Sequence, residues 1–151
     1  MDVDVTLEAP CTAAALFVWV DDLERYPRWL ELVPRAEPAA AADDDPGPAW
    51  TVDLRARLGP LSRSKRLRMV RTVHRPPGHE PGVARFERWE HDDREHSDWI
   101  LEATVEECSR GTSHLTMHLH YGGELFGPVV ERLLADAIAR SKPRLLALVN
   151  G

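Results

Sequence analysis

The sequence predicts an α+β domain in which an antiparallel sheet of seven strands is covered on one face by a long C-terminal helix. Two patterns predict this class. Apolar residues recur at helical spacing through residues 125–149, and most of the chain before them alternates apolar and polar residues, as half-buried strands do. Short turns between the strands favour antiparallel pairing. With 151 residues, we expect one domain that spans positions 1–151.

The C-terminal helix carries one apolar stripe. Between Leu125 and Ile138 the apolar residues fall at i, i+1, i+4 and i+5, and polar residues mostly fill the other face. Pro128 suits a first helical turn, where its missing N–H would have no partner. Pro143 would remove a hydrogen bond inside the helix and press on the preceding turn. We therefore expect a kink near residues 140–142, with a break into two helices as the alternative.

The first third of the chain predicts one strand and two short helices. Alternation over residues 3–7 indicates a half-buried strand, and Thr12 is a candidate N-cap for the helix after it. An aspartate at 21 or 22 suits the start of a second helix. We expect this helix to stop at Tyr26, because a residue before a proline avoids helical backbone angles. A weak strand near Arg35 follows.

A low-complexity insert at residues 36–49 precedes the main strands. It holds an alanine run, three aspartates at 43–45 and a proline-glycine segment, so we expect a mobile hairpin loop with a solvated acidic tip. The strands that follow are predicted at residues 50–58, 67–73, 83–90, 97–107 and 115–121. The phase of strand 83–90 stays open, because Arg85 and Trp89 would share one face and Phe86 favours the opposite phase.

Composition limits the classes of partner. The net charge of −6 argues against nucleic acid as the main partner, and no apolar run reaches the roughly 18 residues of a membrane span. No signal peptide is visible, and two unrelated cysteines, Cys11 and Cys108, suit a reducing cytoplasm, so we expect a cytoplasmic location. No motif for nucleotide, metal or nucleophilic chemistry stands out, and no cofactor is expected. A homodimer stays open.

Charged residues and histidines are expected on the outer face of the sheet. Residues 55–75 carry eight Lys/Arg and residues 87–107 carry nine Asp/Glu, which we expect to pair across neighbouring strands. Three histidines, His114, His118 and His120, share one face of the last strand. The phase that turns Met117 inward turns them outward, so a solvated face is favoured over a metal site.

Several segments resemble one superfamily. They are the strand VDVTLEAP, the segment DDLERYPRWL, the strand HSDWILEATV and the turn YGGELFGPVVERLL before the last helix. Together with the element order they resemble the START-like (SRPBCC, helix-grip) proteins, which include polyketide cyclase/dehydrase and lipid-transport relatives. The resemblance covers essentially the whole chain. It implies a sheet curled around the C-terminal helix, with a cavity for a hydrophobic small molecule such as a lipid, a polyketide or a quinone-like compound.

The inward-facing positions of this fold are the candidate cavity lining. Bulky aromatic and methionine side chains at these positions suit an adaptable apolar site, although they could also close-pack as core. The candidate set is Trp50, Leu54, Met69, Arg71, Phe86, Trp99, Leu101, Met117, Tyr121, Phe126, Val130 and Leu134.

Three functions remain open at this stage, and catalytic residues stay unassigned. The first is binding of a hydrophobic small molecule, the second is a polyketide cyclase or dehydratase, and the third is a partner-binding module. Arg71 falls in phase with Leu67, Met69 and Val73; if it faces inward it could bind a ligand carboxylate, stabilise an enolate or form a structural ion pair with Glu87. Trp29, near the expected cavity mouth, would suit either the first or the third function.

Overall fold

The computed structural model describes residues 1–58, 60–123 and 127–150, and only the backbone of positions 58, 61, 127–131 and 133. A strand, two short helices, six strands and a long helix follow one another, as the sequence predicts. The elements are β1 (Asp2–Ala9), α1 (Ala13–Phe17), η1 (Leu23–Arg28), β2 (Arg35–Ala39), β3 (Ala49–Leu58), β4 (Leu61–Arg75), β5 (Gly82–Arg88), β6 (Trp99–Ser109), β7 (Thr112–Tyr121) and α2 (Gly127–Asn150).

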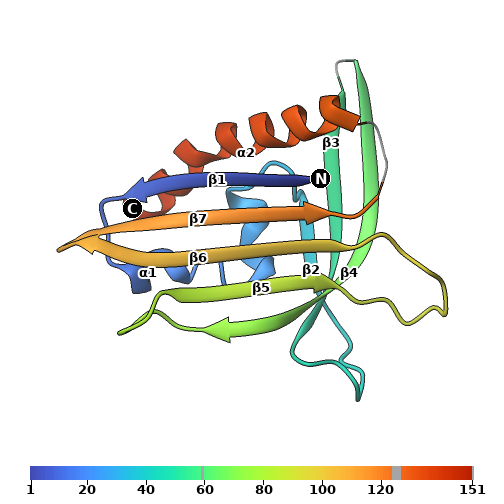
Figure 1. Cartoon of the computed structure of the whole chain (residues 1–151), viewed down its shortest axis with the longest axis horizontal. Coiled ribbons are helices and arrows are strands. Elements are labelled where there is room, and N and C mark those ends of the chain that lie inside the picture. The colour runs from blue at the N-terminus through green and yellow to red at the C-terminus, as the bar shows by residue number, and fades with distance from the viewer. Residues whose placement is uncertain (59, 124–126, 151) are drawn as a thin grey trace.

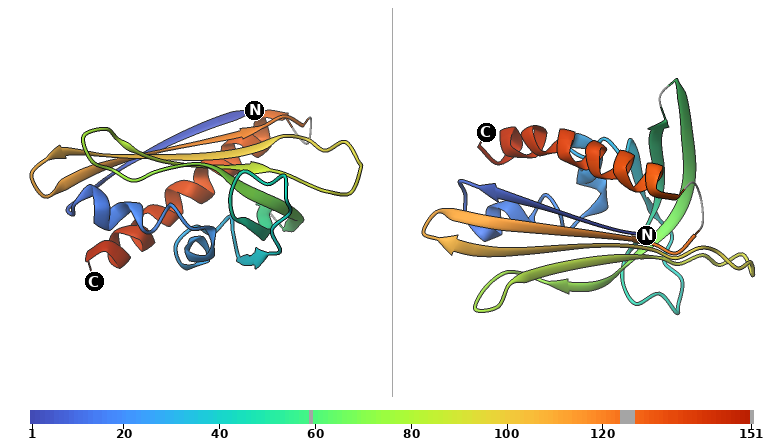
Figure 2. Two further views of the ribbon diagram at one scale, coloured as in Figure 1. Left: turned by 90° about the horizontal axis from the view of Figure 1, so that it is seen from below. Right: turned by 45° about the horizontal axis from the view of Figure 1, so that its top comes forward.

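The seven strands form one antiparallel sheet in the order β1-β7-β6-β5-β4-β3-β2. Strand β3 and the first half of β4 run across the direction of the other strands, so the sheet is strongly bent (Figure 1). Both short helices and α2 lie on one side of the sheet (Figure 2). Helix α2 contacts β1 and β3, which lie near opposite edges of the sheet, so the sheet curves around the helix. This is the predicted helix-grip arrangement.

Side-chain caps start the two short helices. The hydroxyl of Thr12 accepts a hydrogen bond from the Ala15 amide at 3.2 Å, and the carboxylate of Asp22 accepts one from the Glu24 amide at 2.9 Å. The second helix is a 3₁₀ helix that continues through Pro27 to Arg28, so its predicted end at Tyr26 is wrong. A single 3₁₀ segment has few internal hydrogen bonds, and the proline therefore removes little.

A bulge in β4 reverses the alternation that the sequence predicts there. Arg71 pairs in register with Phe86, and the next pair is Val73 with Arg85, which leaves Thr72 as the extra residue. Val73 consequently turns outward and is 40% exposed. The prediction that Val73 shares the inward face of Leu67 and Met69 is therefore wrong beyond the bulge.

Strand β5 adopts the phase in which Phe86 faces inward, with no exposed surface. Arg85 and Glu87 lie on the outer face, where their side chains approach to 3.5 Å, and Arg85 also lies 3.4 Å from Glu102 of β6. The acidic run adjoins β4 only at its start, where Glu87 is the register partner of Val70 and Glu90 accepts the Arg68 amide. Because β5 separates β4 from β6, the expected pairing is wrong for the acidic residues of β6. The basic run instead pairs with β3, as in the 2.8 Å contact of Arg66 with Asp53.

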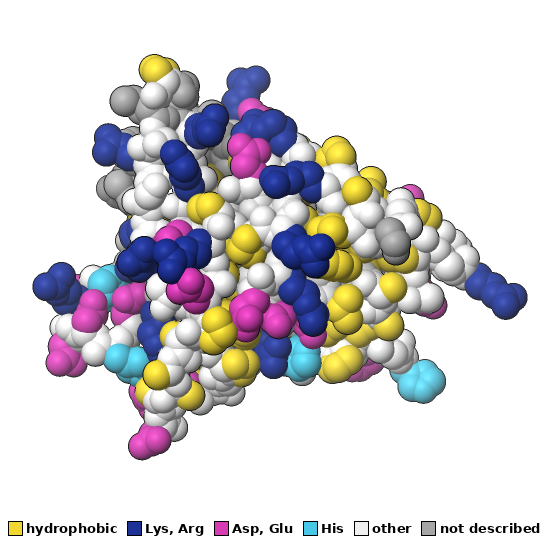
Figure 3. Space-filling model, turned by 180° about the vertical axis from the view of Figure 1, so that it is seen from behind, with side chains coloured by type: hydrophobic (Ala, Val, Ile, Leu, Met, Phe, Trp, Pro, Cys, Tyr) yellow, Lys and Arg dark blue, Asp and Glu magenta, His cyan; other side chains and the backbone are white. Residues whose placement is uncertain are grey.

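Helix α2 is continuous from Gly127 to Asn150 with Pro143 inside it, so the alternative of two separate helices is wrong, and the kink stays a prediction. Its buried side chains include Leu134, Ala137, Ile138 and Leu145. In the part of the chain that the structure describes, no helix combines the length and apolar character needed to cross a bilayer. Seen from the helix side, Lys and Arg side chains gather over the end that carries the β3–β4 hairpin (Figure 3).

Candidate functional site

Aromatic rings fill the part of the interior that lies next to η1. Tyr26 packs against Trp29 with ring centroids 5.1 Å apart and against the edge of Phe86 at 6.0 Å, and Trp50 meets Phe86 at 5.6 Å. The indole N–H of Trp29 donates to the carbonyl of Trp19 at 3.0 Å. Trp29 is only 2% exposed, so its expected place at the mouth of a cavity is wrong. Its ring belongs to the core.

The space left over is an apolar chamber between the sheet and α2, with a volume of about 30 Å³. Strands β3, β4, β6 and β7 form one wall, and the segment around η1 and helix α2 form the other. We refer to this cavity as the chamber. Its lining consists of Leu23, Leu30, Leu32, Val33, Val52, Leu54, Leu67, Met69, Trp99, Leu101, Met117, Leu119 and Ile138.

Part of the predicted lining borders the chamber: Leu54, Met69, Trp99, Leu101 and Met117. Another part is buried in the same core without bordering it: Trp50, Phe86, Tyr121 and Leu134. Phe126 and the side chain of Val130 lie outside the described residues. The wall made by the segment after η1 is not predicted by any periodic pattern, because Leu30, Leu32 and Val33 lie outside the strands and helices.

Arg71 occupies the inward phase of β4 but does not line the chamber. Its guanidinium donates to the backbone carbonyl of Asp21 at 2.8 Å and lies 5.9 Å from the ring centroid of Trp50. Glu87 faces the other side of the sheet with Arg85. Arg71 therefore ties β4 to the turn before η1, and the expected pairing with Glu87 is wrong.

Trp99 is the lining side chain that carries a hydrogen-bond donor. The residue is 8% exposed, and its indole packs at a tilt against Tyr121 with ring centroids 4.5 Å apart. The indole nitrogen Nε1 is buried and has no hydrogen-bond partner among the described residues. Buried donors in proteins usually have partners, so this nitrogen is an unpaired donor in the core, whereas the surface of the chamber itself is apolar.

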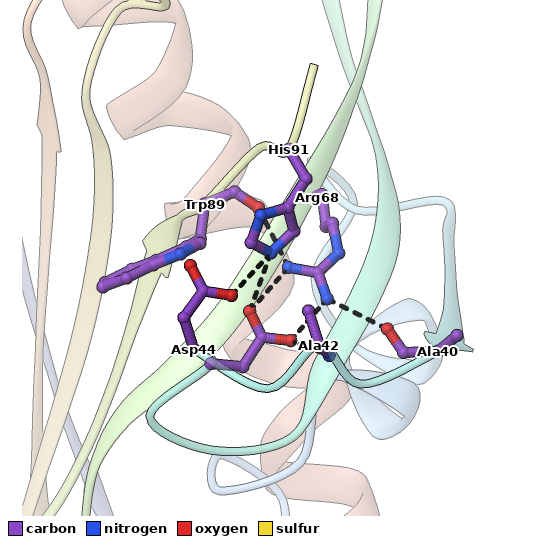
Figure 4. A network of polar contacts seen from close by, with 7 residues as sticks. Ala40, Ala42, Asp44, Arg68, Trp89 and His91 are labelled. Carbon is purple, nitrogen blue, oxygen red and sulfur yellow. Dashed lines mark hydrogen bonds and ion pairs between the residues drawn. The ribbon is translucent and has the colours of Figure 1, made fainter. Parts of the chain in front are cut away.

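A polar network outside the chamber fastens the loop between β2 and β3 (Figure 4). Arg68 contacts the carboxylate of Asp45 at 2.6 Å and donates to the carbonyls of Ala40 and Trp89. Arg68 is also the main reason that the pKa of Asp45 lies well below its usual range. The Asp45 side chain is 1% exposed, so the predicted solvated acidic tip is wrong for this residue. It is the anchor of the loop.

Two groups of side chains have the composition of metal ligands: Asp44, Asp45 and His91, and Glu90, Asp92 and His96. In the first group, Arg68 holds both carboxylate oxygens of Asp45, so its negative charge is already balanced. In the second, His96 bonds to Asp92 at 2.8 Å and Glu90 accepts the Arg68 amide at 2.6 Å. These contacts account for both groups as structural polar clusters, and we assign no metal to either.

His118 and His120 of β7 lie on the outer face and pair with aspartates of β1, and His114 lies opposite Glu8 in register. His118 contacts Asp4 at 2.7 Å, and His120 contacts Asp2 at 2.9 Å. The hydrogen bond with Asp4 is the largest cause of a raised pKa at His118. This surface therefore joins the N-terminal strand to β7 and has no connection with the chamber.

Comparisons with known proteins place this geometry among START-like folds. No protein-family model matches the sequence, and a search of curated proteins found no similar sequence. A START superfamily protein from Mycobacterium smegmatis shares 17% identity over 99% of this chain and 97% of its own, with a TM-score of 0.71. Human StAR-related lipid transfer protein 5 superposes with a TM-score of 0.78 at 14% identity, covering 97% of this chain and 74% of its own. Human STARD10 gives 0.72 at 11% identity over 99% of this chain and 63% of its own.

Proposed function

We propose that this chain, which has the helix-grip fold of START-like proteins, binds an apolar small molecule in the chamber between its sheet and α2. The observation that carries the proposal is the chamber itself, which is lined by apolar side chains. Apolar cavities hold water weakly, so an apolar ligand that enters gains contacts at little cost in desolvation. The lipid transfer named for one structural relative agrees with this class of ligand.

The chamber must widen to hold a ligand. Its volume of about 30 Å³ is far below the roughly 300–1,000 Å³ of typical small-molecule sites. Met69 and Met117 lie in its wall on different strands. Methionine side chains are unbranched and change rotamer readily, so they are the lining groups best able to make room.

The alternative functions receive less support. A cyclase or dehydratase needs polar groups that face each other across the substrate, and the described lining of the chamber presents an apolar surface; its one side-chain donor, the indole N–H of Trp99, is buried. A partner-binding module needs a broad exposed apolar patch. Among the described residues, the large apolar side chains that are exposed are Val18 at 44% and Val73 at 40%. Binding of an apolar ligand is therefore the function that the geometry favours.

The test uses N-phenyl-1-naphthylamine, a neutral dye whose fluorescence rises in apolar surroundings. We expect saturable binding to the wild-type protein, and at least tenfold weaker binding when Leu101→Phe or Met117→Phe fills the chamber. Val18→Phe, which enlarges an exposed side chain, is the matched control and should bind as the wild type does. Absence of saturable dye binding, or equal binding by all variants, would refute the proposal. If the dye binds as expected, native mass spectrometry of protein purified from its own host would identify a co-purified ligand.

A further inference from the structure

Two cations share the concave face of the sheet with the chamber. Lys65 pairs in register with Leu54, and Arg88 pairs with Met69. Leu54 and Met69 both line the chamber. Directly opposed residues of antiparallel strands point to the same face with Cβ atoms about 4.5–5.5 Å apart. Each cation is therefore a direct neighbour of a lining side chain.

Trp99 lies at the same end of the sheet as these cations, where β6 begins and β7 ends. Glu87 and Ile100 are register partners, so Arg88 and Trp99, one residue beyond them, end β5 and begin β6 opposite each other. The ammonium of Lys65 lies 5.8 Å from the ring centroid of Tyr121, which packs at a tilt against Trp99. We call Lys65, Arg88 and Trp99 the donor cluster.

The donor cluster has unused hydrogen-bonding capacity. Nε of Arg88 and Nε1 of Trp99 are both buried without a hydrogen-bond partner among the described residues. The Arg88 side chain is 8% exposed, and its Nε lies 3.7 Å from a carboxylate oxygen of Glu90, beyond hydrogen-bond distance. A terminal nitrogen of Arg88 donates to the carbonyl of Ser97 at 3.4 Å.

The electrostatics of this end favour an anion. Burial lowers the pKa of Lys65, and the positive charge of Arg88 lowers it further, with Glu90 acting in the opposite direction. Two cations thus face one carboxylate. The strand ends nearby are basic as well, since residues 53–66 carry five Lys/Arg and one Asp, and Figure 3 shows basic side chains gathered over this hairpin. A negative group placed here would relieve the repulsion between Lys65 and Arg88.

We propose that the donor cluster binds the anionic head, a carboxylate, of an amphipathic ligand whose apolar body occupies the chamber. This inference rests on the proposed function and narrows its ligand to an apolar organic acid. The two oxygens of a carboxylate can accept hydrogen bonds from Lys65, from Nε of Arg88 and from the indole of Trp99. The carboxylate of the ligand would accept hydrogen bonds from the donors that have no partner in the protein.

The experiment compares two dyes with the same aromatic frame. N-phenyl-1-naphthylamine is neutral, and 8-anilinonaphthalene-1-sulfonate adds one anionic group. We expect the anionic dye to bind more tightly, and Lys65→Gln to weaken it about tenfold or more, the usual value of a hydrogen bond to a charged group, while the neutral dye is unaffected. Trp99→Phe should weaken the anionic dye severalfold with the ring retained. Arg66→Gln removes the same charge on the outer face and is the control.

Competition then separates carboxylate recognition from general anion binding. Decanoate should displace the anionic dye at lower concentration than decan-1-ol does, and Lys65→Gln should abolish that difference. If the neutral dye binds and the anionic dye binds no more tightly, the proposal that the donor cluster binds an anion is refuted, and the proposed function is unaffected. An equal loss of anionic dye in Lys65→Gln and Arg66→Gln also overturns it. If neither dye binds, the result refutes the proposed function, on which the donor-cluster proposal depends.

Discussion

Ser141 makes the buried polar link between α2 and the segment after η1. The residue has no exposed surface. Its hydroxyl donates to the carbonyl of Ala137 at 2.9 Å and accepts the amide of Glu31 at 2.9 Å. Beside it, on the surface, Arg140 contacts the carboxylate of Glu31 at 3.2 Å, with side chains 56% and 40% exposed. Two contacts thus join the same elements, one buried and one exposed.

We predict that the buried contact of Ser141 contributes more to the free energy of unfolding than the exposed ion pair of Arg140 does. Ser141→Ala removes two hydrogen bonds worth about 1 kcal/mol each and leaves the Glu31 amide without its acceptor. The better helix propensity of alanine offsets about 0.5 kcal/mol of this. The expected loss in the free energy of unfolding is therefore about 1–2 kcal/mol, or a fall in Tm of roughly 2–8 °C for a domain of this size. Arg140→Ala removes an exposed ion pair, and its expected cost is within about 0.5 kcal/mol.

The assay is urea unfolding followed by tryptophan fluorescence, with both variants compared at equal m-value. Equal m-values are needed because a change in slope would signal a different unfolded or native state. The reasoning is refuted if Ser141→Ala is as stable as the wild type, or if Arg140→Ala costs more than Ser141→Ala. Either result would mean that the exposed pair, and not the buried hydroxyl, holds α2 to this segment.

Three further predictions concern the hydrogen bonds and turns of the frame. The hydroxyl of Tyr26 donates to the carbonyl of Val20 at 2.8 Å, and burial raises the pKa of this phenol; Tyr26→Phe should lower the free energy of unfolding by about 1–2 kcal/mol in thermal melts. The raised pKa of His118 means that its bond with Asp4 stabilises the fold fully below its unfolded pKa of about 6.5 and less as pH rises through the folded value. Stability should therefore fall from pH 6 to pH 8, and Asp4→Asn should flatten that dependence. Gly111 has a φ of +77° with open space around it, so Gly111→Ala should cost about 1 kcal/mol through backbone strain alone, and Gly111→Asn less, as measured by the midpoint in urea.

The sequence predicts the strands and the long helix because the positions of these elements depend on the periodic burial of apolar residues. The apolar stripe of α2 and the alternation in β3, β6 and β7 follow from which face each element turns to the core. The inward set of β7, with Met117 and Leu119 on one face, appears in the structure with the phase that alternation predicts. Local capping residues, such as Thr12, are also readable because the cap and its partner are neighbours in the chain.

Features that depend on distant partners could not be predicted in this way. The bulge at Thr72 inserts one residue, and no change in composition marks it. Asp45 resembles the other loop aspartates in sequence, and only folding brings Arg68 against it. Lys65 stands in a run of basic residues, and its place on the concave face follows from its register with Leu54. Each of these depends on strand register, which turn lengths and bulges set.

The location of the chamber follows from how the two sides of the interior are filled. On the η1 side, four aromatic rings pack edge to face or tilted and leave no room to rearrange cheaply, because each ring is held by the next. Next to these rings, Met69, the register partner of Trp50, lines the chamber together with Met117 and Ile138, and methionine side chains change rotamer readily. Widening should therefore occur at Met69 and Met117. Met69 is the register partner of Arg88, so the part of the wall that can adapt adjoins the donor cluster, and one ligand could contact both.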